Sequence, residues 1–253
     1  MKTYACVLST NNYLKGVLVL NENLKRVNSK YDLLCLINEN ISEESKNTLT
    51  KYGIKYKLFN SVPYNVNFTS TWNYTFDKFN VFLLEDYEKV VCLDADLLIL
   101  ENLDFLFEYD TPAMVIDNPT FTDRFNSGVM VITPNKDTFK ELVRMKEQQS
   151  LYNRVIGDQN ILNDYYLEDG FINRIPDEYN VLRTITEEKI LYLNPNTNTE
   201  EERYKVVLNA IVDNPVVLHY VGKNKPFYID MPYADPYSDI YQEYLNIIKE
   251  KGE

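Results

Sequence analysis

Two aspartates that follow a short apolar run are the first candidates for chemistry in this sequence. Asp94 and Asp96 come directly after Val90–Leu93, and apolar residues resume at Leu97–Leu100. A run of four apolar residues is too short for a helix and suits a buried strand, whose carboxyl end lies where open α/β sheets bind ligands. Side chains two positions apart on an extended segment face the same side, so both carboxylates can bind one divalent cation. An acidic turn or a helix cap is the alternative explanation of this Asp-x-Asp pair.

The single histidine of the chain ends another apolar run. His219 follows Val216–Leu218, and Gly222 and Lys225 come shortly after it. Imidazole binds several divalent metals, a glycine allows a close approach of the backbone to a ligand, and a lysine brings positive charge to a diphosphate. A hydrogen-bonded core histidine fits the same run, so both interpretations stay open at this point.

Two short polar segments are further candidates. Phe125–Gly128 reads Phe-Asn-Ser-Gly and precedes an apolar run, so it predicts a turn that brings the backbone close to a ligand. In the second segment, Asp158 can cap the following helix while Gln159 projects from its first turn. An ordinary turn and an ordinary cap are the alternatives.

The predicted elements alternate between strands and helices, which indicates one α/β domain over residues 1–253 with a mostly parallel central sheet. Strands are expected at Tyr4–Ser9, Tyr31–Ile37, Ile54–Phe59, Lys89–Leu93, Met114–Asp117, Gly128–Thr133 and the run that ends at His219. Helices are expected at Asn11–Arg26, Ser42–Tyr52, Thr71–Tyr87, Asn135–Gln149, Asp158–Tyr166 and Ser238–Lys249. The polar stretch Thr184–Asn209 is expected to consist mostly of loops.

Charge and composition exclude several classes of partner. The net charge of −12 argues against binding to nucleic acid, whose phosphates require a basic face. No apolar stretch approaches the ~18 residues that span a bilayer, so no membrane association is expected. Cys6, Cys35 and Cys92 lie in apolar runs and lack metal-ligand spacing, which indicates buried thiols in a reducing compartment. Together these features predict a cytoplasmic protein.

In order and spacing, the motifs resemble the glycogenin-like members of glycosyltransferase family 8. The resemblance covers roughly residues 3–229. The matching segments are Leu8–Tyr13 with Lys15-Gly16, Lys78 in the helix before the acids, Asp94-Ala95-Asp96, Phe125–Gly128, Gly157–Gln159 and His219–Phe227. The resemblance implies a Rossmann-like, nucleotide-sugar-binding fold of the glycosyltransferase A type.

The same resemblance implies a role for each matching residue. The segment that would hold uracil and ribose consists of Leu8, Thr10, Asn11 and Tyr13. The ligands of Mn²⁺, with Mg²⁺ as the alternative, would be Asp94, Asp96 and His219, with Ala95 between the acids, and Gly222 and Lys225 would contact the diphosphate. The residues around the donor sugar would be Lys78, Asn126, Ser127, Gly128, Asp158 and Gln159.

The activity implied is transfer of a hexose from a UDP-sugar to a hydroxyl of a glycan, a protein tyrosine or a small molecule. Glucose is the first candidate for the hexose and galactose the second. A metal would stabilise the leaving diphosphate, and Lys78 and Lys225 would add positive charge. Anomeric configuration would be retained through a covalent intermediate on Asp158 or Gln159, or through same-face attack in which the leaving phosphate takes the acceptor proton. A homodimer is a further expectation.

Two departures concern the acceptor. Glycogenins carry an additional Asp where this chain has Val155, and their self-glucosylated tyrosine lies in the segment that corresponds to Leu182–Leu193, where this chain has Tyr192. Self-glucosylation on Tyr192 is therefore one hypothesis, and the long synthase-binding tail of animal glycogenins has no counterpart in this sequence.

Two other functional classes compete with the transferase. A haloacid dehalogenase-type phosphatase also starts from Asp-x-Asp, but its motif normally lies near the N-terminus and has Thr or Val where this chain has Leu98. A catalytically silent UDP-sugar-binding protein would share most of the same residues, although Lys78, Asp158 and Gln159 favour turnover.

Overall fold

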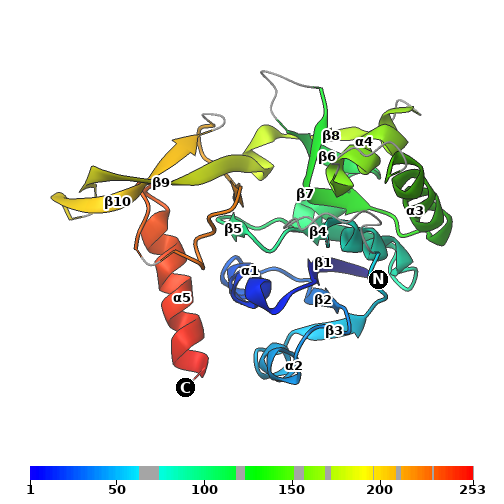
Figure 1. Ribbon diagram of the computed structural model, residues 1–253, viewed down its shortest axis with the longest axis horizontal. Helices are drawn as coiled ribbons and strands as arrows, with labels where there is room; N and C mark the ends of the chain where they lie inside the picture. Colours follow the sequence, from blue (N-terminus) through cyan, green and yellow to red (C-terminus); the bar gives the residue numbers. More distant parts are fainter. Residues whose placement is uncertain are drawn as a thin grey trace.

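The computed structural model describes residues 1–62, 74–117, 123–150, 157–168, 172–195, 197–208, 212–229 and 231–252. These residues form two sheets, flanked by helices (Figure 1). The central sheet has the strand order β3-β2-β1-β4-β7-β6-β8, and the second has the order β10-β9-β11-β5.

The central sheet confirms the predicted α/β class. Its strands are β1 (Lys2–Leu8), β2 (Leu33–Ile37), β3 (Lys55–Leu58), β4 (Lys89–Leu93), β6 (Ala113–Ile116), β7 (Phe125–Ile132) and β8 (Asn173–Ile175). Four strand pairs are parallel, and the two antiparallel pairs both involve β7. Because β7 runs in reverse, its first residues lie at the edge where β4 ends.

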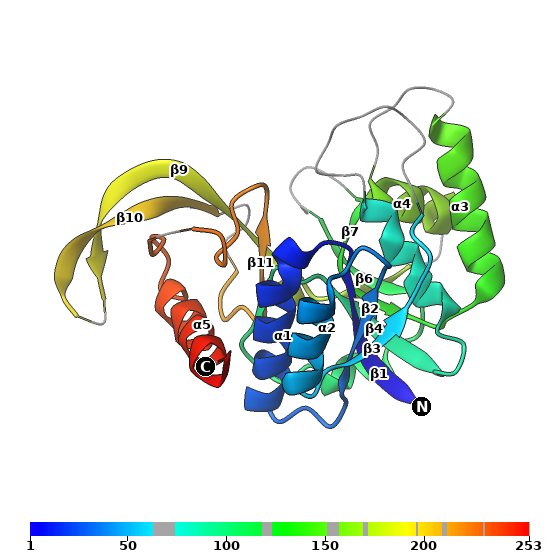
Figure 2. The same cartoon turned by 60° about the horizontal axis from the view of Figure 1, so that its bottom comes forward.

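Helices lie on both faces of the central sheet, and the last helix of the chain packs on the first α-helix instead. They are η1 (Asn11–Tyr13), α1 (Leu14–Arg26), α2 (Glu43–Lys51), η2 (Thr75–Leu83), η3 (Asp104–Glu108), α3 (Lys136–Ser150), α4 (Asp158–Glu168), η4 (Asp177–Tyr179) and α5 (Ser238–Gly252), where η marks a 3₁₀-helix. Figure 2 shows α1 and α2 on the opposite side of the sheet from α3 and α4. Ser42 caps α2, because its hydroxyl accepts from the Ser45 amide at 3.2 Å, and the helix lies within the predicted range Ser42–Tyr52.

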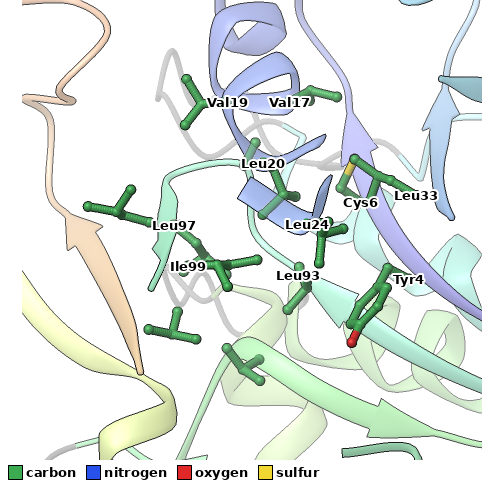
Figure 3. Close-up of a cluster of buried hydrophobic side chains, with 14 of the residues drawn as sticks. Tyr4, Cys6, Val17, Val19, Leu20, Leu24, Leu33, Leu93, Leu97 and Ile99 are labelled. Carbon is green, nitrogen blue, oxygen red and sulfur yellow. The ribbon is translucent and has the colours of Figure 1, made fainter. Parts of the chain in front are cut away.

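Alternation along the strands produces two hydrophobic layers. Tyr4 and Cys6 of β1 face the layer beneath α1, while Ala5 between them faces the layer beneath η2, α3 and α4. Figure 3 shows the first layer, in which Leu20 and Leu24 of α1 pack toward the sheet. Burying a leucine side chain contributes about 1.5–3 kcal/mol, so this packing holds α1 against the sheet.

The N-terminal turn of α1 packs tightly against the acidic segment. A Cβ on Gly16 would lie 2.2 Å from the carbonyl oxygen of Ala95, which is backbone and cannot move aside cheaply. A residue with a side chain would push α1 away from this segment. The glycine of the Lys15-Gly16 pair therefore has a packing reason.

The second sheet overturns one prediction. The prediction that Thr184–Asn209 consists mostly of loops is wrong. β9 (Val181–Asn194) and β10 (Thr199–Leu208) form a long antiparallel hairpin. Figure 1 shows this hairpin extending away from the central sheet. Its exposed faces carry charged pairs such as Lys205–Glu188 (2.8 Å). Because of these charges, the sequence lacks the clear alternation of apolar and polar residues that indicates a strand.

Two further expectations need correction. Phe125–Gly128 is not a turn but the beginning of β7, and its pairing with β6 contains an irregularity after Met114. The helix expected at Thr71–Tyr87 is the 3₁₀-helix η2 over Thr75–Leu83, and residues 71–73 lie outside the described residues. In the described part of the chain, no helix is long and apolar enough to cross a bilayer.

Candidate functional site

Asp94 and Asp96 lie in the link between the two sheets. β4 of the central sheet ends just before Asp94, and β5 (Leu97–Ile99) of the second sheet begins just after Asp96. The Asp94 amide donates to the Gly128 carbonyl on β7 at 3.0 Å, and the Asp96 carbonyl accepts from the Tyr220 amide at 3.0 Å. Hydrogen bonds to both sheets therefore fix the backbone of this link.

His219 reaches the two carboxylates from β11 (Val217–Val221), which pairs antiparallel with β5. Ligand atoms of Asp94, Asp96 and His219 all lie within 4.8 Å of one another. The His219 Nε2 atom is 3.3 Å from Asp96 Oδ1 and 3.8 Å from Asp94 Oδ2. Two carboxylate oxygens and one imidazole nitrogen suit a divalent transition metal, so the residues predicted to bind metal fit such an ion.

A hydrogen-bond relay determines which nitrogen of His219 faces the acids. The Gly128 amide donates to Asn126 Oδ1 at 2.8 Å, so that oxygen is an acceptor and Asn180 Nδ2 donates to it at 2.8 Å. The Asn180 Oδ1 atom then faces His219 Nδ1 at 2.9 Å and accepts its hydrogen. The Nε2 atom therefore faces the carboxylates, where a protonated ring pairs with them and a ring without that proton has its lone pair placed for metal binding.

Sequence inspection did not find Asn180. It lies just before β9, after a short 3₁₀-helix, and only 4% of its surface is exposed. Its only sequence signal is an Asn directly before the apolar pair Val181-Leu182, which is also typical of an ordinary strand entrance. Its partner Asn126 is also fixed by Asp117, whose Oδ1 accepts from Asn126 Nδ2 at 2.8 Å.

Lys78 of η2 is the central cation on the sugar side of the predicted site. Its Nζ lies 2.7 Å from Asp94 Oδ1 and 3.1 Å from Asp158 Oδ2, and it donates to the carbonyl and hydroxyl of Ser127 at 3.1 Å each. Burial lowers the pKa of Lys78, but the carboxylates of Asp158 and Asp94 outweigh burial and raise it. Lys78 therefore stays protonated between two acids.

Asp158 lies at the start of α4 and its carboxylate contacts other elements. One oxygen accepts from Thr75 Oγ1, and the other accepts from Ser127 Oγ at 2.8 Å. Burial raises the pKa of Asp158, but Lys78, Thr75 and Ser127 together bring it below the usual value, so the group is ionised. Gln159 Oε1 accepts from the Ser127 amide at 3.4 Å.

Lys225 holds the other metal-facing acid. Its Nζ lies 2.5 Å from Asp96 Oδ2 and donates to the Tyr220 carbonyl at 2.7 Å, and only 5% of the residue is exposed. Burial alone would raise the pKa of Asp96, but His219 and Lys225 lower it well below the usual range. Gly222 precedes this lysine in a turn with φ of +85°, a conformation that favours glycine.

The segment predicted to hold uridine follows β1. Its Tyr13 ring packs edge-on against Phe227 and Tyr228, with ring centroids 5.6 and 5.8 Å apart, so this segment lies beside the Lys225 turn. The Asn11 side-chain oxygen accepts from the Ser45 hydroxyl of α2 at 2.8 Å. The remaining members differ in exposure, since Leu8 is fully buried and Thr10 half-buried.

The acceptor-side residues are less closely tied to this cluster. Tyr192 lies on β9 ten residues beyond Leu182, the register partner of His219, which corresponds to roughly 30 Å of strand. Its ring packs on Arg203, with the guanidinium carbon 4.9 Å from the ring centroid. Val155 lies outside the described residues.

Comparisons with known proteins agree with this arrangement. The family model "Glycosyl transferase family 8" matches residues 6–228. UDP-glucuronate:xylan alpha-glucuronosyltransferase 1 of Arabidopsis thaliana is 32% identical to this chain, over 98% of this chain and 36% of its own length. Mouse glycogenin-1 is 26% identical, over 87% of this chain and 64% of its own length. This chain spans about a third of the length of the plant relatives.

A solved structure shares the fold. The galactosyltransferase LgtC superimposes with a TM-score of 0.70 at 16% identity, covering 98% of this chain and 96% of that one. At this identity the likeness supports the glycosyltransferase A type of fold alone. The family match, which includes the acids, the histidine and Lys78, shows that this chain belongs to glycosyl transferase family 8.

Proposed function

We propose that this chain transfers a hexose from a UDP-sugar to a hydroxyl acceptor with retention of anomeric configuration. Glucose is the first candidate for the transferred sugar. The observation that carries the proposal is the meeting of Asp94, Asp96 and His219 within 4.8 Å, directly beside the buried Lys78–Asp158 pair. A metal site and an ionised carboxylate with its cation are what departure of a nucleoside diphosphate and stabilisation of the sugar require.

The metal is proposed to be Mn²⁺, with Mg²⁺ as the alternative. Asp94, Asp96 and His219 would hold it, and Mg²⁺ usually prefers a set of oxygen ligands without imidazole. When bound, the ion supplies Lewis-acid stabilisation of the leaving diphosphate.

The chain's own residues do the remaining work. Lys225 can turn from Asp96 to the diphosphate, because both contacts of its Nζ are hydrogen bonds that a phosphate oxygen can replace. Lys78 keeps Asp158 ionised beside the sugar. Asp158 or Gln159 would form the covalent intermediate in one route to retention, whereas same-face attack needs only their electrostatic support.

Charge around Lys78 favours a neutral hexose. Asp94 and Asp158 flank this one ammonium, and Asp117 lies behind Asn126. A uronic acid sugar would place another carboxylate beside these three aspartates, and the like charges would repel one another. Glucuronosyl transfer is nevertheless the second candidate, because plant relatives at 32% identity are named for it, and galactosyl transfer is the third.

Acceptor, assembly and location are proposed more broadly. A glycan, a protein tyrosine or a small hydroxyl compound is the acceptor class, and a homodimer would allow Tyr192 of one copy to reach the site of another. The distance along β9 disfavours self-glucosylation of Tyr192 within one copy. Cys6, Cys35 and Cys92 are free and buried, which supports a reducing, cytoplasmic setting.

The test measures UDP release and intact-protein mass with UDP-glucose, UDP-galactose and UDP-glucuronate, each with Mn²⁺ and with a chelator. We expect metal-dependent release that is fastest with UDP-glucose and is lost in Asp96→Ala. Mass increments that persist in Tyr192→Phe would place self-labelling elsewhere. No release with any donor, despite UDP binding, would favour either a missing acceptor or the catalytically silent binding protein, and a panel of added hydroxyl acceptors would separate the two.

A further inference from the structure

A buried carboxylate directly before Lys78 has no part in the chemistry described above. Asp77 of η2 is fully buried. Its Oδ2 accepts from Ser9 Oγ at 2.7 Å, from Ser61 Oγ at 3.2 Å and from Asn38 Nδ2 at 3.4 Å, and its Oδ1 accepts from the Val62 amide at 2.8 Å. Within the described residues, every partner of this carboxylate is a neutral donor.

These donors come from the carboxyl ends of three neighbouring parallel strands. Ser9 follows β1, Asn38 follows β2 and Ser61 lies beyond β3. Asn38 Nδ2 also donates to the Ser9 carbonyl at 3.1 Å and to Ser61 Oγ at 3.2 Å, so the three strand ends are linked to one another as well. Asp77 thus fastens η2 to the edge of the central sheet.

The next residue, Lys78, uses a different side of the same helix. A 3₁₀-helix has three residues per turn, so consecutive side chains point about 120° apart. Asp77 points to the strand ends while Lys78 points to Asp94, Ser127 and Asp158. Any rotation or sliding of η2 that breaks the Asp77 contacts must also move the Lys78 backbone.

A 3₁₀-helix depends on such an external anchor more than an α-helix does. Its i to i+3 hydrogen bonds have poorer geometry, and η2 spans nine residues, which is long for this type. The Asp77 carbonyl also accepts from Asn80 Nδ2 at 3.0 Å, which fixes this turn from within.

We propose that Asp77 is a positioning residue for glycosyl transfer, which holds η2 so that Lys78 Nζ stays between Asp94, Ser127 and Asp158. The inference rests on the proposed transferase function. It predicts that Asp77 acts on the reaction through Lys78 and not through general stability.

The test is a double-mutant cycle on the full chain with Asp77→Asn, Lys78→Met and the double variant, measured as steady-state UDP release. We expect Asp77→Asn to lower kcat on the order of 10- to 100-fold. In the Lys78→Met background, Asp77→Asn should lower kcat by less than about twofold, because the residue it positions is gone. Affinity for UDP with Mn²⁺, measured by calorimetry, should stay within about twofold in Asp77→Asn.

Asp104 offers a matched control at the opposite end of the sheet. It also belongs to a 3₁₀-helix, and its carboxylate accepts from Tyr4 OH (2.9 Å), Ser29 Oγ (2.7 Å) and the Lys30 amide (2.9 Å). Asp104→Asn should lower the unfolding temperature without changing kcat. If Asp77→Asn does not fold, Ser61→Ala removes one donor and should show the same dependence on Lys78, with a smaller effect.

The outcomes separate this inference from the proposed function. Equal losses from Asp77→Asn in the wild-type and Lys78→Met backgrounds would overturn the positioning role while leaving the transferase intact. A loss of kcat in Asp104→Asn as large as in Asp77→Asn would overturn it too, because stability alone would then explain both. Absence of turnover by the wild-type protein with every donor would overturn the proposed function, and the positioning role with it.

Discussion

Gly128→Ala tests the geometry of the proposed metal site by adding a single methyl group. A Cβ at this position would lie 2.5 Å from His219 Cε1, 2.6 Å from His219 Nδ1 and 2.9 Å from Asn126 Oδ1. Carbon atoms in contact are normally ~3.5–4.0 Å apart, so the imidazole must retreat by about 1 Å. The Gly128 backbone cannot yield easily, because its carbonyl and amide bond Asp94 and Asn126.

A shift of this size is large for a metal ligand. Coordination distances tolerate deviations of only about 0.2 Å, and displacement of a supporting group typically costs ~10- to 100-fold in metal affinity. His219 is 5% exposed and packed between strands, so the ring has little room to recover its position. We expect Mn²⁺ affinity in the presence of UDP to fall by ~10- to 100-fold, and stability by ~1–3 kcal/mol from overpacking.

The assay is Mn²⁺ titration followed by the electron paramagnetic resonance of the free ion, together with thermal unfolding. Gly53→Ala is the matched control, because Gly53 has φ of +74° and no atom within 4 Å of an added Cβ. That variant should lose ~1–2 kcal/mol to backbone strain and bind Mn²⁺ normally. Wild-type Mn²⁺ affinity in Gly128→Ala would refute the placement of His219 against this glycine.

Three further perturbations probe the same site. Asn180→Ala removes the acceptor of His219 Nδ1 and should lower Mn²⁺ affinity by ~10-fold or more, as measured by the same titration. Lys225→Met removes a cation that competes for Asp96, so calorimetry should show Mn²⁺ binding without UDP strengthened by about tenfold and UDP binding weakened. The pKa of Asp158 is lowered in the folded state, so its contribution to stability is present above the ordinary carboxyl value near 3.8 and is lost as the pH falls through the folded-state pKa. Urea unfolding should therefore show Asp158→Asn less stable than wild type at pH 7 by ~1–3 kcal/mol, and a difference that shrinks below pH 3.8.

Local patterns in the sequence predicted most of the central sheet. The run before Asp94 is β4, and the Ser42 cap opens α2, because each depends on neighbouring residues alone. The hairpin β9–β10 was missed for a physical reason. A two-stranded ribbon that extends away from the core buries few apolar side chains, so its composition is that of a loop.

The candidate site depends on contacts that local patterns do not encode. Asp94 and Asp96 could be identified from the sequence as a carboxylate pair. The sequence did not indicate that the segment after them leaves the central sheet and pairs with the strand of His219. The reversed direction of β7, which carries Asn126 to the end of β4, is likewise a property of the whole topology. Only the family resemblance indicated that these motifs, which are distant in the sequence, belong to one site.

The position of the acids between two sheets explains why the site needs two lysines. In this structure each acid has its own ammonium partner, with Lys78 on Asp94 and Lys225 on Asp96, and the two lysines come from η2 and from the turn after β11. Two carboxylates this close together, one of them buried and the other partly buried, would repel one another if they lacked counterions. The lysines therefore stabilise the junction in this structure, and under the proposed function both would offset the negative charge that develops on the departing diphosphate.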